Sequence, residues 1–175
     1  MNPVFNVINE LIQNVQNTQM EAIEQASIAC ADAIEKGGIL QAYGSGHSEA
    51  GAMEVAHRAG GFIPTKKIVE PARGTYEGIE GVGTTFLKKV DIRENDVVFV
   101  ISNSGRNPFP IEMAIGAKKK GAIVIAITSV EASKNLTSKH SCGKNLYQLA
   151  DIVLDNCVPE GDCGCEIEGY DSKIC

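Results

Sequence analysis

Apolar positions near the start of the chain recur at the spacing of a helix. Roughly one turn separates many of the apolar side chains there: Val4, Ile8, Leu11, Ile12 and Val15. This spacing is typical of an amphipathic helix and differs from the alternation of a half-buried strand. A Gly-Gly pair at 37–38 suits the end of a helix. The pattern predicts a helical arm over residues 1–36, as one long helix or two end to end, which packs on the domain or joins subunits.

After residue 38, short apolar runs alternate with helical segments. We expect strands over 39–43, 67–70, 97–101, 122–128 and 152–154, and helices over 48–58, 110–120 and 144–150. The runs VVFVI and AIVIAI are apolar along their whole length, which indicates strands buried on both faces. Such strands alternating with helices predict a doubly wound α/β domain over residues 37–175. A glycine-rich segment, 71–83, is expected to form a mobile loop beside the sheet.

Composition narrows the range of partners. The chain has 175 residues, which favours one domain, and its net charge of −6 argues against a nucleic-acid or anionic-membrane surface. No apolar run approaches the ~18–20 residues that span a bilayer. A secretory signal would carry basic residues near its start, but no basic residue precedes Lys36. We therefore expect a cytoplasmic protein with reduced thiols, no membrane contact and no nucleic-acid partner.

Glycines and hydroxyl side chains follow three of the predicted strands. In doubly wound sheets, ligands bind at the carboxyl ends of the strands. The residues at these positions are Gly44, Ser45, Gly46, His47 and Ser48; Ser102, Asn103, Ser104, Gly105, Arg106 and Asn107; and Thr128 and Ser129. Glycines let several backbone N–H groups point into one concavity, and hydroxyls add further donors. Three such loops at adjacent strand ends predict a phosphate-binding site.

A dinucleotide site is the competing interpretation. Gly44-Ser45-Gly46 opens a GxGxxG motif, but Glu49 stands where the third glycine belongs. Glu70 closes the next predicted strand, where it would meet a ribose, so this alternative stays open. No GxxxxGK[ST] loop is present, which argues against nucleotide triphosphate hydrolysis. We expect no cofactor.

Three stretches of the sequence resemble the sugar isomerase (SIS) domain family. They are AYGSGHSEAGAMEVAHRAGG (42–61), VISNSGRNPFPIEMAIGAKKKGAIVIAITS (100–129) and TSKHSCGKNLYQLADIVLDN (137–156). The chain is most similar to small bacterial proteins with a single such domain, often described as phosphoheptose isomerases. The resemblance implies a flavodoxin-like, three-layer α/β/α fold with a mostly parallel five-stranded sheet. It also implies a phosphorylated sugar as ligand and a homodimer or homotetramer.

The family's phosphate-binding loop matches the segment 102–105, and its first-strand loop matches Ser45 and Ser48. Where the family often closes the phosphate loop with another hydroxyl, this chain has Asn107. Isomerases of the family take their base from the helix after the first strand, and Glu54 is the matching carboxylate here. The family's partner histidine comes from a C-terminal helix that has no counterpart in this sequence.

Moving a proton between adjacent carbons of a sugar requires a base, an acid and an anchor for the phosphate. We assign Glu54 as base, with Arg58 four residues on as either an ion-pair partner or part of the site. His47 and His140 are the candidates for acid assistance or ring opening. Each also has an interpretation without function, as a loop or rim residue.

Four cysteines in the last part of the chain fit a metal site poorly. Their spacing departs from the paired C-x₂₋₄-C pattern of zinc sites: Cys157, Cys163, Cys165 and Cys175. We expect reduced thiols and no metal.

The sequence thus predicts a sugar-phosphate aldose–ketose isomerase. A non-catalytic phosphosugar sensor, or a subunit that needs a partner, is the first alternative, since it would carry the same phosphate loops. An etherase or lyase acting on an amino-sugar phosphate is the second.

Overall fold

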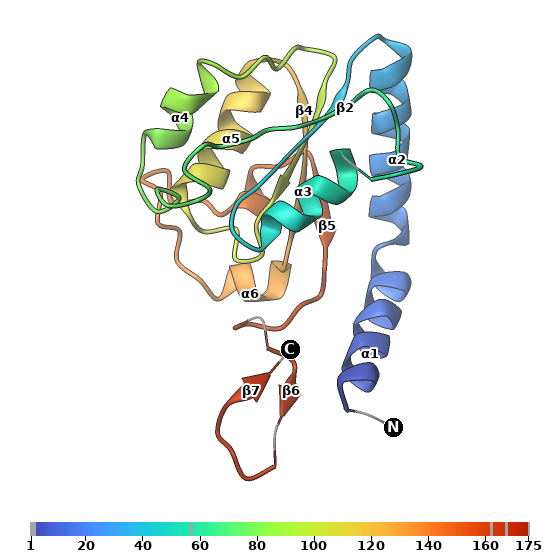
Figure 1. Ribbon diagram of the computed structural model, residues 1–175, viewed down its shortest axis with the longest axis vertical. Helices are drawn as coiled ribbons and strands as arrows, with labels where there is room; N and C mark the ends of the chain where they lie inside the picture. The colour runs from blue at the N-terminus through green and yellow to red at the C-terminus, as the bar shows by residue number, and fades with distance from the viewer. Residues whose placement is uncertain (1–2, 57, 162, 167, 175) are drawn as a thin grey trace.

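A parallel sheet forms the centre of the molecule (Figure 1). The computed structural model describes residues 3–56, 58–161, 163–166 and 168–174. Within them, five strands pair in the order β2-β1-β3-β4-β5. Their bounds are β1 Leu40–Gly44, β2 Thr65–Lys67, β3 Val97–Ile101, β4 Ile123–Thr128 and β5 Ile152–Asp155. This is the flavodoxin-like strand order, and it confirms the predicted fold class.

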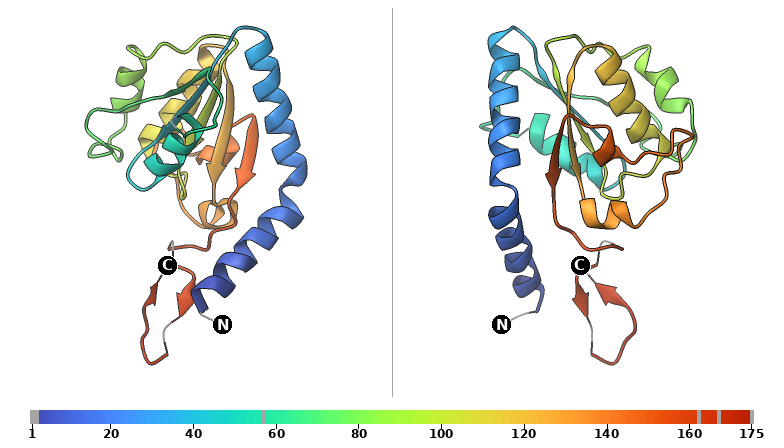
Figure 2. Two further views of the ribbon diagram at one scale, coloured as in Figure 1. Left: turned by 45° about the vertical axis from the view of Figure 1, so that its right-hand side comes forward. Right: turned by 180° about the vertical axis from the view of Figure 1, so that it is seen from behind.

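Two helices, α1 (Pro3–Thr18) and α2 (Met20–Glu35), make up the N-terminal segment. They run end to end with a break at Gln19, so the alternative of two helices is confirmed over that of one long helix. Figure 2 shows α2 alongside the sheet while α1 continues past the sheet's edge. The break is tied to the sheet, because the Gln19 side chain accepts a hydrogen bond of 2.9 Å from the Asp155 N–H at the end of β5.

Helices cover both faces of the sheet and give three layers. On one face, α2 and α3 (Ser48–Ala56) lie over β1 and β3. On the other face lie α4 (Val82–Leu87), α5 (Pro108–Lys119) and the 3₁₀ helix η1 (Leu146–Gln148). The short helix α6 (Val130–Lys134) follows β4.

The period of two along the strands separates the core into two sides. Leu40 and Val97 pack with Ala26 and Ala33 of α2. Ala42 and Ile101 pack with Ala52 of α3. Alternate residues point to the opposite face, where the largest cluster contains Tyr43, Val98, Val100, Phe109 and Met113.

Several predicted boundaries differ from the structure. The expected helix 144–150 is only the single turn η1, which begins with a capping box between Asn145 and Gln148. The strand expected at 67–70 lies at 65–67, and Glu70 instead starts a turn by accepting the N–H of Ala72. Two helices were missed, α4 and α6. The sequence of α4, VGTTFL, is short and contains a glycine, so it resembles a loop.

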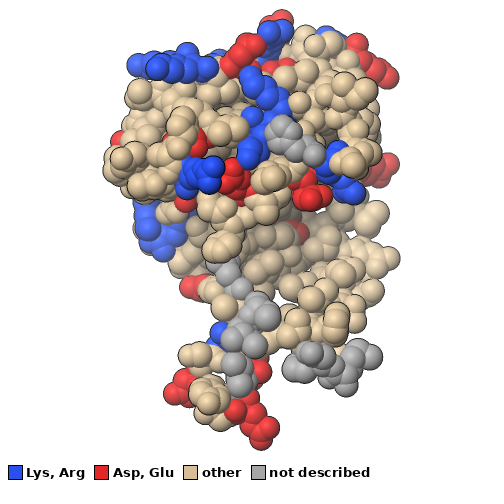
Figure 3. Space-filling view, viewed as in Figure 1, with Lys and Arg blue, Asp and Glu red and all other residues tan. Residues whose placement is uncertain are grey.

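The C-terminal residues form a separate small hairpin. β6 (Cys165–Glu166) pairs antiparallel with β7 (Lys173–Ile174), away from the main sheet (Figures 1 and 2). Among the residues that the structure describes, no helix has the length and apolar character needed to cross a bilayer. Figure 3 shows positive and negative side chains interspersed over the α/β body, without a continuous basic stripe on that face.

Candidate functional site

The two glycine- and serine-rich loops that the sequence singled out are neighbours in space. Gly44, the last residue of β1, is paired in register with Ile101, the last residue of β3. The segments 45–48 and 102–105 therefore leave the sheet side by side.

These loops line one pocket of about 760 Å³, within the usual range for small-molecule sites. Side-chain hydroxyls and amides dominate its polar lining. The lining residues are Ser45, Gly46, His47, Ser48, Gly51, Glu77, Ile101, Ser102, Asn103, Ser104, Asn156 and Val158. We call this the strand-end pocket. Seven of the residues predicted for the site lie together in it: Ser45, Gly46, His47, Ser48, Ser102, Asn103 and Ser104.

A close backbone approach shapes the first loop. A Cβ at Gly44 would lie 2.2 Å from the Ser48 carbonyl oxygen, so only glycine fits there. Gly46 has a φ of 58°, in the left-handed region that glycine favours. The chain thus turns within four residues and starts α3 at Ser48, which places the positive end of a helix at the pocket.

The second loop is held from behind by the next two strand ends. The Thr128 hydroxyl and the Ser129 N–H both donate to the Asn103 carbonyl, at 2.9 and 3.0 Å. The Asn156 amide donates to the Asn103 side-chain oxygen at 2.8 Å. The Ser129 hydroxyl in turn donates to the Val158 carbonyl. Thr128 and Ser129, predicted as ligand-binding residues, therefore lie behind the pocket and use their hydroxyls to hold its wall.

Three other predicted residues lie beside the pocket and do not line it. Gly105 has a φ of 59° and packs against Thr128 and Leu146. The Arg106 carbonyl accepts the Lys139 N–H. Asn107 precedes α5, and its carbonyl accepts the Ile111 N–H.

His140 is engaged elsewhere. Its Nδ1 accepts the Cys142 N–H at 3.0 Å, and its Nε2 lies 3.6 Å from Glu80 and 3.7 Å from Glu112. Both the side chain and the N–H of Ser141 donate to Glu80, and these bonds lower the pKa of that carboxyl. The histidine thus joins segment 138–143 to α5 and to the turn before α4.

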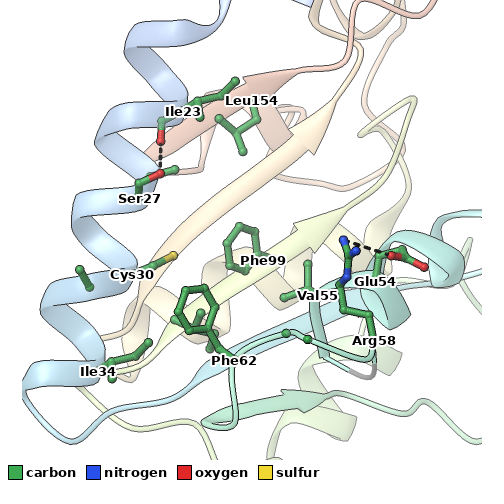
Figure 4. Close-up of a pocket in the computed structure, with 15 residues that line it drawn as sticks. Ile23, Ser27, Cys30, Ile34, Glu54, Val55, Arg58, Phe62, Phe99 and Leu154 are labelled. Atoms are coloured by element: carbon green, nitrogen blue, oxygen red, sulfur yellow. Dashed lines mark hydrogen bonds and ion pairs between the residues drawn. The ribbon is translucent and has the colours of Figure 1, made fainter. Parts of the chain in front are cut away.

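Glu54, predicted as the base, lines a different cavity. An apolar groove of about 520 Å³ separates α2 from α3 over Phe99 (Figure 4). Figure 4 shows the Glu54 carboxylate at one end of this groove, paired with Arg58 at 3.7 Å. Both side chains are more than half exposed. We call this cavity the α2–α3 groove. The roles predicted for Glu54 and His140 stay predictions.

Two polar residues of the strand-end pocket were missed by the sequence analysis. Asn156 follows β5, so applying the strand-end rule to this strand as well would have found it. Glu77 lies in the segment 71–83, which the sequence predicts to be a mobile loop, and no local pattern marks this residue.

The alternatives left open by the sequence can also be placed. The Glu70 carboxylate accepts the N–H groups of Ala72 and Gly74, at 2.6 and 2.8 Å, and so is occupied by its own turn. Within the described part of the chain, no group of three or more His, Cys, Asp or Glu side chains is arranged to hold a metal. Cys175, the last of the four cysteines considered, lies outside the described residues.

A doubly wound sheet with a hydroxyl-lined pocket at its strand ends defines a class of small-ligand binding domains. Within that class, the chain belongs to the SIS domain family, whose model matches residues 5–129. A UPF0309 protein of Listeria monocytogenes is 48% identical to it, over 98% of this chain and 73% of that protein. A UPF0309 protein of Halalkalibacterium halodurans is 42% identical, over 91% of this chain and 69% of that protein. The resemblance drawn from the sequence motifs is confirmed.

Solved structures agree on the fold. The phosphoheptose isomerase of Neisseria gonorrhoeae superposes with a TM-score of 0.70, covering 90% of this chain and 84% of that one. Its sequence is 22% identical. At that distance the likeness establishes a shared architecture, with five parallel strands between helical layers.

Proposed function

We propose that the chain binds a phosphorylated sugar in the strand-end pocket and interconverts its aldose and ketose forms. The observation that carries the proposal is the convergence of four serines, Ser45, Ser48, Ser102 and Ser104, on one pocket. A phosphate monoester needs many short donors around three oxygens. Serine hydroxyls and loop N–H groups can supply such donors here, and the start of α3 adds positive electrostatic potential.

The rest of the lining suits a sugar. Asn103 and Asn156 add amide groups that can both donate and accept, as hydroxyl-bearing ligands require. Ile101 and Val158 supply apolar surface for the carbon skeleton. His47 and Glu77 are the titratable side chains among the described lining residues, so the pocket carries groups able to move a proton.

Thermal melts against hexose, heptose and amino-sugar phosphates test the binding. A ligand at 100 times its Kd stabilises the folded state by about 2.7 kcal/mol, which a melt resolves. The unphosphorylated sugars are the matched controls and should give no shift. Equal shifts with and without the phosphate would contradict the proposal.

Turnover is tested separately, by exchange of the C2 proton of the bound sugar phosphate into deuterated water. Binding with exchange and ketose formation supports an isomerase. Binding without exchange supports the alternative of a sensor or partner-dependent subunit. Loss of a substituent from an amino-sugar phosphate supports the etherase or lyase alternative.

We further propose that two copies of the chain associate through α1 and α2. Three exposed apolar side chains of α1, Phe5, Ile8 and Ile12, lie along one side of that helix. Glu10 is the one charged residue among its sixteen. A helix with this composition is expected to bury its apolar side against another surface, and an identical helix offers a matching one. Light scattering should find a dimer or tetramer that Ile8→Lys dissociates, whereas Asn14→Lys, an exposed position on the opposite side of α1, should leave it intact.

A further inference from the structure

Glu77 is the one carboxylate among the described residues that line the strand-end pocket. Two backbone hydrogen bonds fix its position. Its N–H donates to the Gly74 carbonyl at 3.0 Å, and its own carbonyl accepts the Phe109 N–H at 3.1 Å. The second bond ties Glu77 to the first turn of α5. A half-buried carboxylate is therefore held at the pocket by the scaffold.

The segment that carries Glu77 packs directly on the serine loop. A Cβ at Gly74 would lie 3.0 Å from the Cβ of Ser45, and Gly74 has a φ of 85°. The Glu70 carboxylate holds this turn by accepting the Gly74 N–H. Glu77 and Ser45 thus belong to one packed unit although 32 positions separate them in the sequence.

Tyr43 lies beneath this unit with an unused hydroxyl. The residue is fully buried, and within the described residues its hydroxyl has no hydrogen-bond partner. Its ring stacks on Phe109 with centroids 5.1 Å apart. Burial raises the pKa of Tyr43, the nearby Ser45 side chain lowers it, and the charges of Glu77 and Glu70 raise it. The Ser45 side chain is thus close to the phenol, but the two groups do not have the geometry of a hydrogen bond. The phenol of Tyr43 therefore stays protonated, and it interacts electrostatically with Ser45 and Glu77.

An unpartnered buried hydroxyl destabilises a folded protein. Its presence beside a polar pocket is explained if a partner forms when the ligand binds. Phe109 links the elements involved, because its ring holds Tyr43 and its N–H holds Glu77.

We infer that Glu77 is the catalytic carboxylate that moves the substrate proton, and that Tyr43 positions Ser45 and Glu77 by hydrogen bonding in the bound state. This assignment rests on the proposed function. Glu77 takes the proton from C2 of the open-chain aldose phosphate. The C–H electron pair forms the C1–C2 double bond, and the carbonyl electrons move to O1. Return of the proton to C1, with transfer of the O2 proton to O1, gives the ketose and restores the carboxylate.

Glu77→Gln is the central variant, because it keeps the shape of the side chain and removes its basicity. C2 exchange should fall by about 100-fold or more, the usual contribution of a positioned base. The ligand-induced rise in melting temperature should be kept. Glu131→Gln, an exposed carboxylate on α6, is the matched control and should exchange like wild type. Glu54→Gln makes the same change in the α2–α3 groove and tests the competing assignment.

The outcomes separate the two proposals. If no sugar phosphate shifts the melting of the wild-type chain, the proposed function fails. If wild type binds and exchanges while Glu77→Gln exchanges at the same rate, the assignment of Glu77 is wrong. It is also wrong if wild type binds without exchange, or if Glu54→Gln abolishes exchange.

Tyr43→Phe distinguishes a positioning role from a structural one. The variant keeps the ring that stacks on Phe109 and deletes only the unpartnered hydroxyl. Without ligand, its melting temperature should equal or exceed that of wild type. With ligand, affinity or exchange should fall roughly fivefold, as expected for one lost hydrogen bond. Wild-type binding and exchange in Tyr43→Phe would overturn the role of Tyr43.

Discussion

The strand-end pocket and the α2–α3 groove share α3 as a wall and differ in chemistry. The first end of α3 contributes Ser48 to the pocket, and its other end contributes Glu54 and Val55 to the groove. The pocket is lined by groups that backbone bonds fix in place. The groove is lined mainly by apolar side chains, with one exposed ion pair at its end. The comparison teaches that a carboxylate on the helix after the first strand can line a different cavity from the serine loops.

The largest effect should come from the turn that creates the pocket. Gly44→Ala places a Cβ 2.2 Å from a backbone oxygen that cannot move without shifting the start of α3. We expect destabilisation of more than about 3 kcal/mol, or failure to fold, as for a severely overpacked site. Urea unfolding measures this.

Gly46→Ala is the matched control for Gly44→Ala. A Cβ there meets no atom within 4 Å, so the cost is limited to the left-handed backbone, about 1 kcal/mol. Equal destabilisation by the two variants would show that conformation, and not close approach, shapes the pocket.

The next largest effect should be on ligand affinity, which should depend on residues of the strand-end pocket and not on residues of the α2–α3 groove. Ser102→Ala and Ser104→Ala should each raise the Kd for a sugar phosphate by about tenfold or more, because hydrogen bonds to charged groups contribute about 1.5–3 kcal/mol. Isothermal titration measures the change. Ser27→Ala, in the groove, removes a hydroxyl that donates to the Ile23 carbonyl and should leave the Kd unchanged. A higher Kd in Ser27→Ala would indicate that the ligand binds in the α2–α3 groove.

The sequence predicted the fold well where burial alone decides the pattern. The strand 97–101 was predicted with its observed bounds because VVFVI is apolar on both faces. Strand ends then located the serine loops, since parallel strands finish at the same edge of the sheet. Thr128 shows the limit of this rule: it follows the same pattern, but its hydroxyl holds the Asn103 carbonyl.

Tertiary structure decides that Glu77 lines the strand-end pocket and that Glu54 lines the α2–α3 groove. Glu54 and Glu77 cannot be ranked from local sequence, because one lies on a recognisable helix and the other in a glycine-rich turn. The Phe109–Glu77 bond, which brings the turn to the pocket, joins residues 32 positions apart and leaves no periodic signal.

The smallest effect concerns the ion pairs at the two ends of α3. Lys67 bonds Glu49 at 2.7 Å beside the pocket, with side chains 12% and 34% exposed. Arg58 lies 3.7 Å from Glu54 at the groove, with both side chains mostly exposed. Because solvent screens exposed pairs, Lys67→Met should lower the free energy of unfolding more than Arg58→Met at neutral pH.

Acid should remove the destabilisation caused by Lys67→Met. The hydrogen bond and charge of Lys67 lower the pKa of Glu49 from its ordinary value of 4.5. A lowered pKa in the folded state stabilises the protein above pH 4.5, and this contribution is lost as the pH falls through the lowered value. The free energies of unfolding of wild type and Lys67→Met, measured in urea, should therefore differ at pH 7 and converge as the pH falls through the lowered pKa of Glu49. A gap that persists after Glu49 is protonated would mean that the aliphatic packing of Lys67, and not its charge, secures the pocket end of α3.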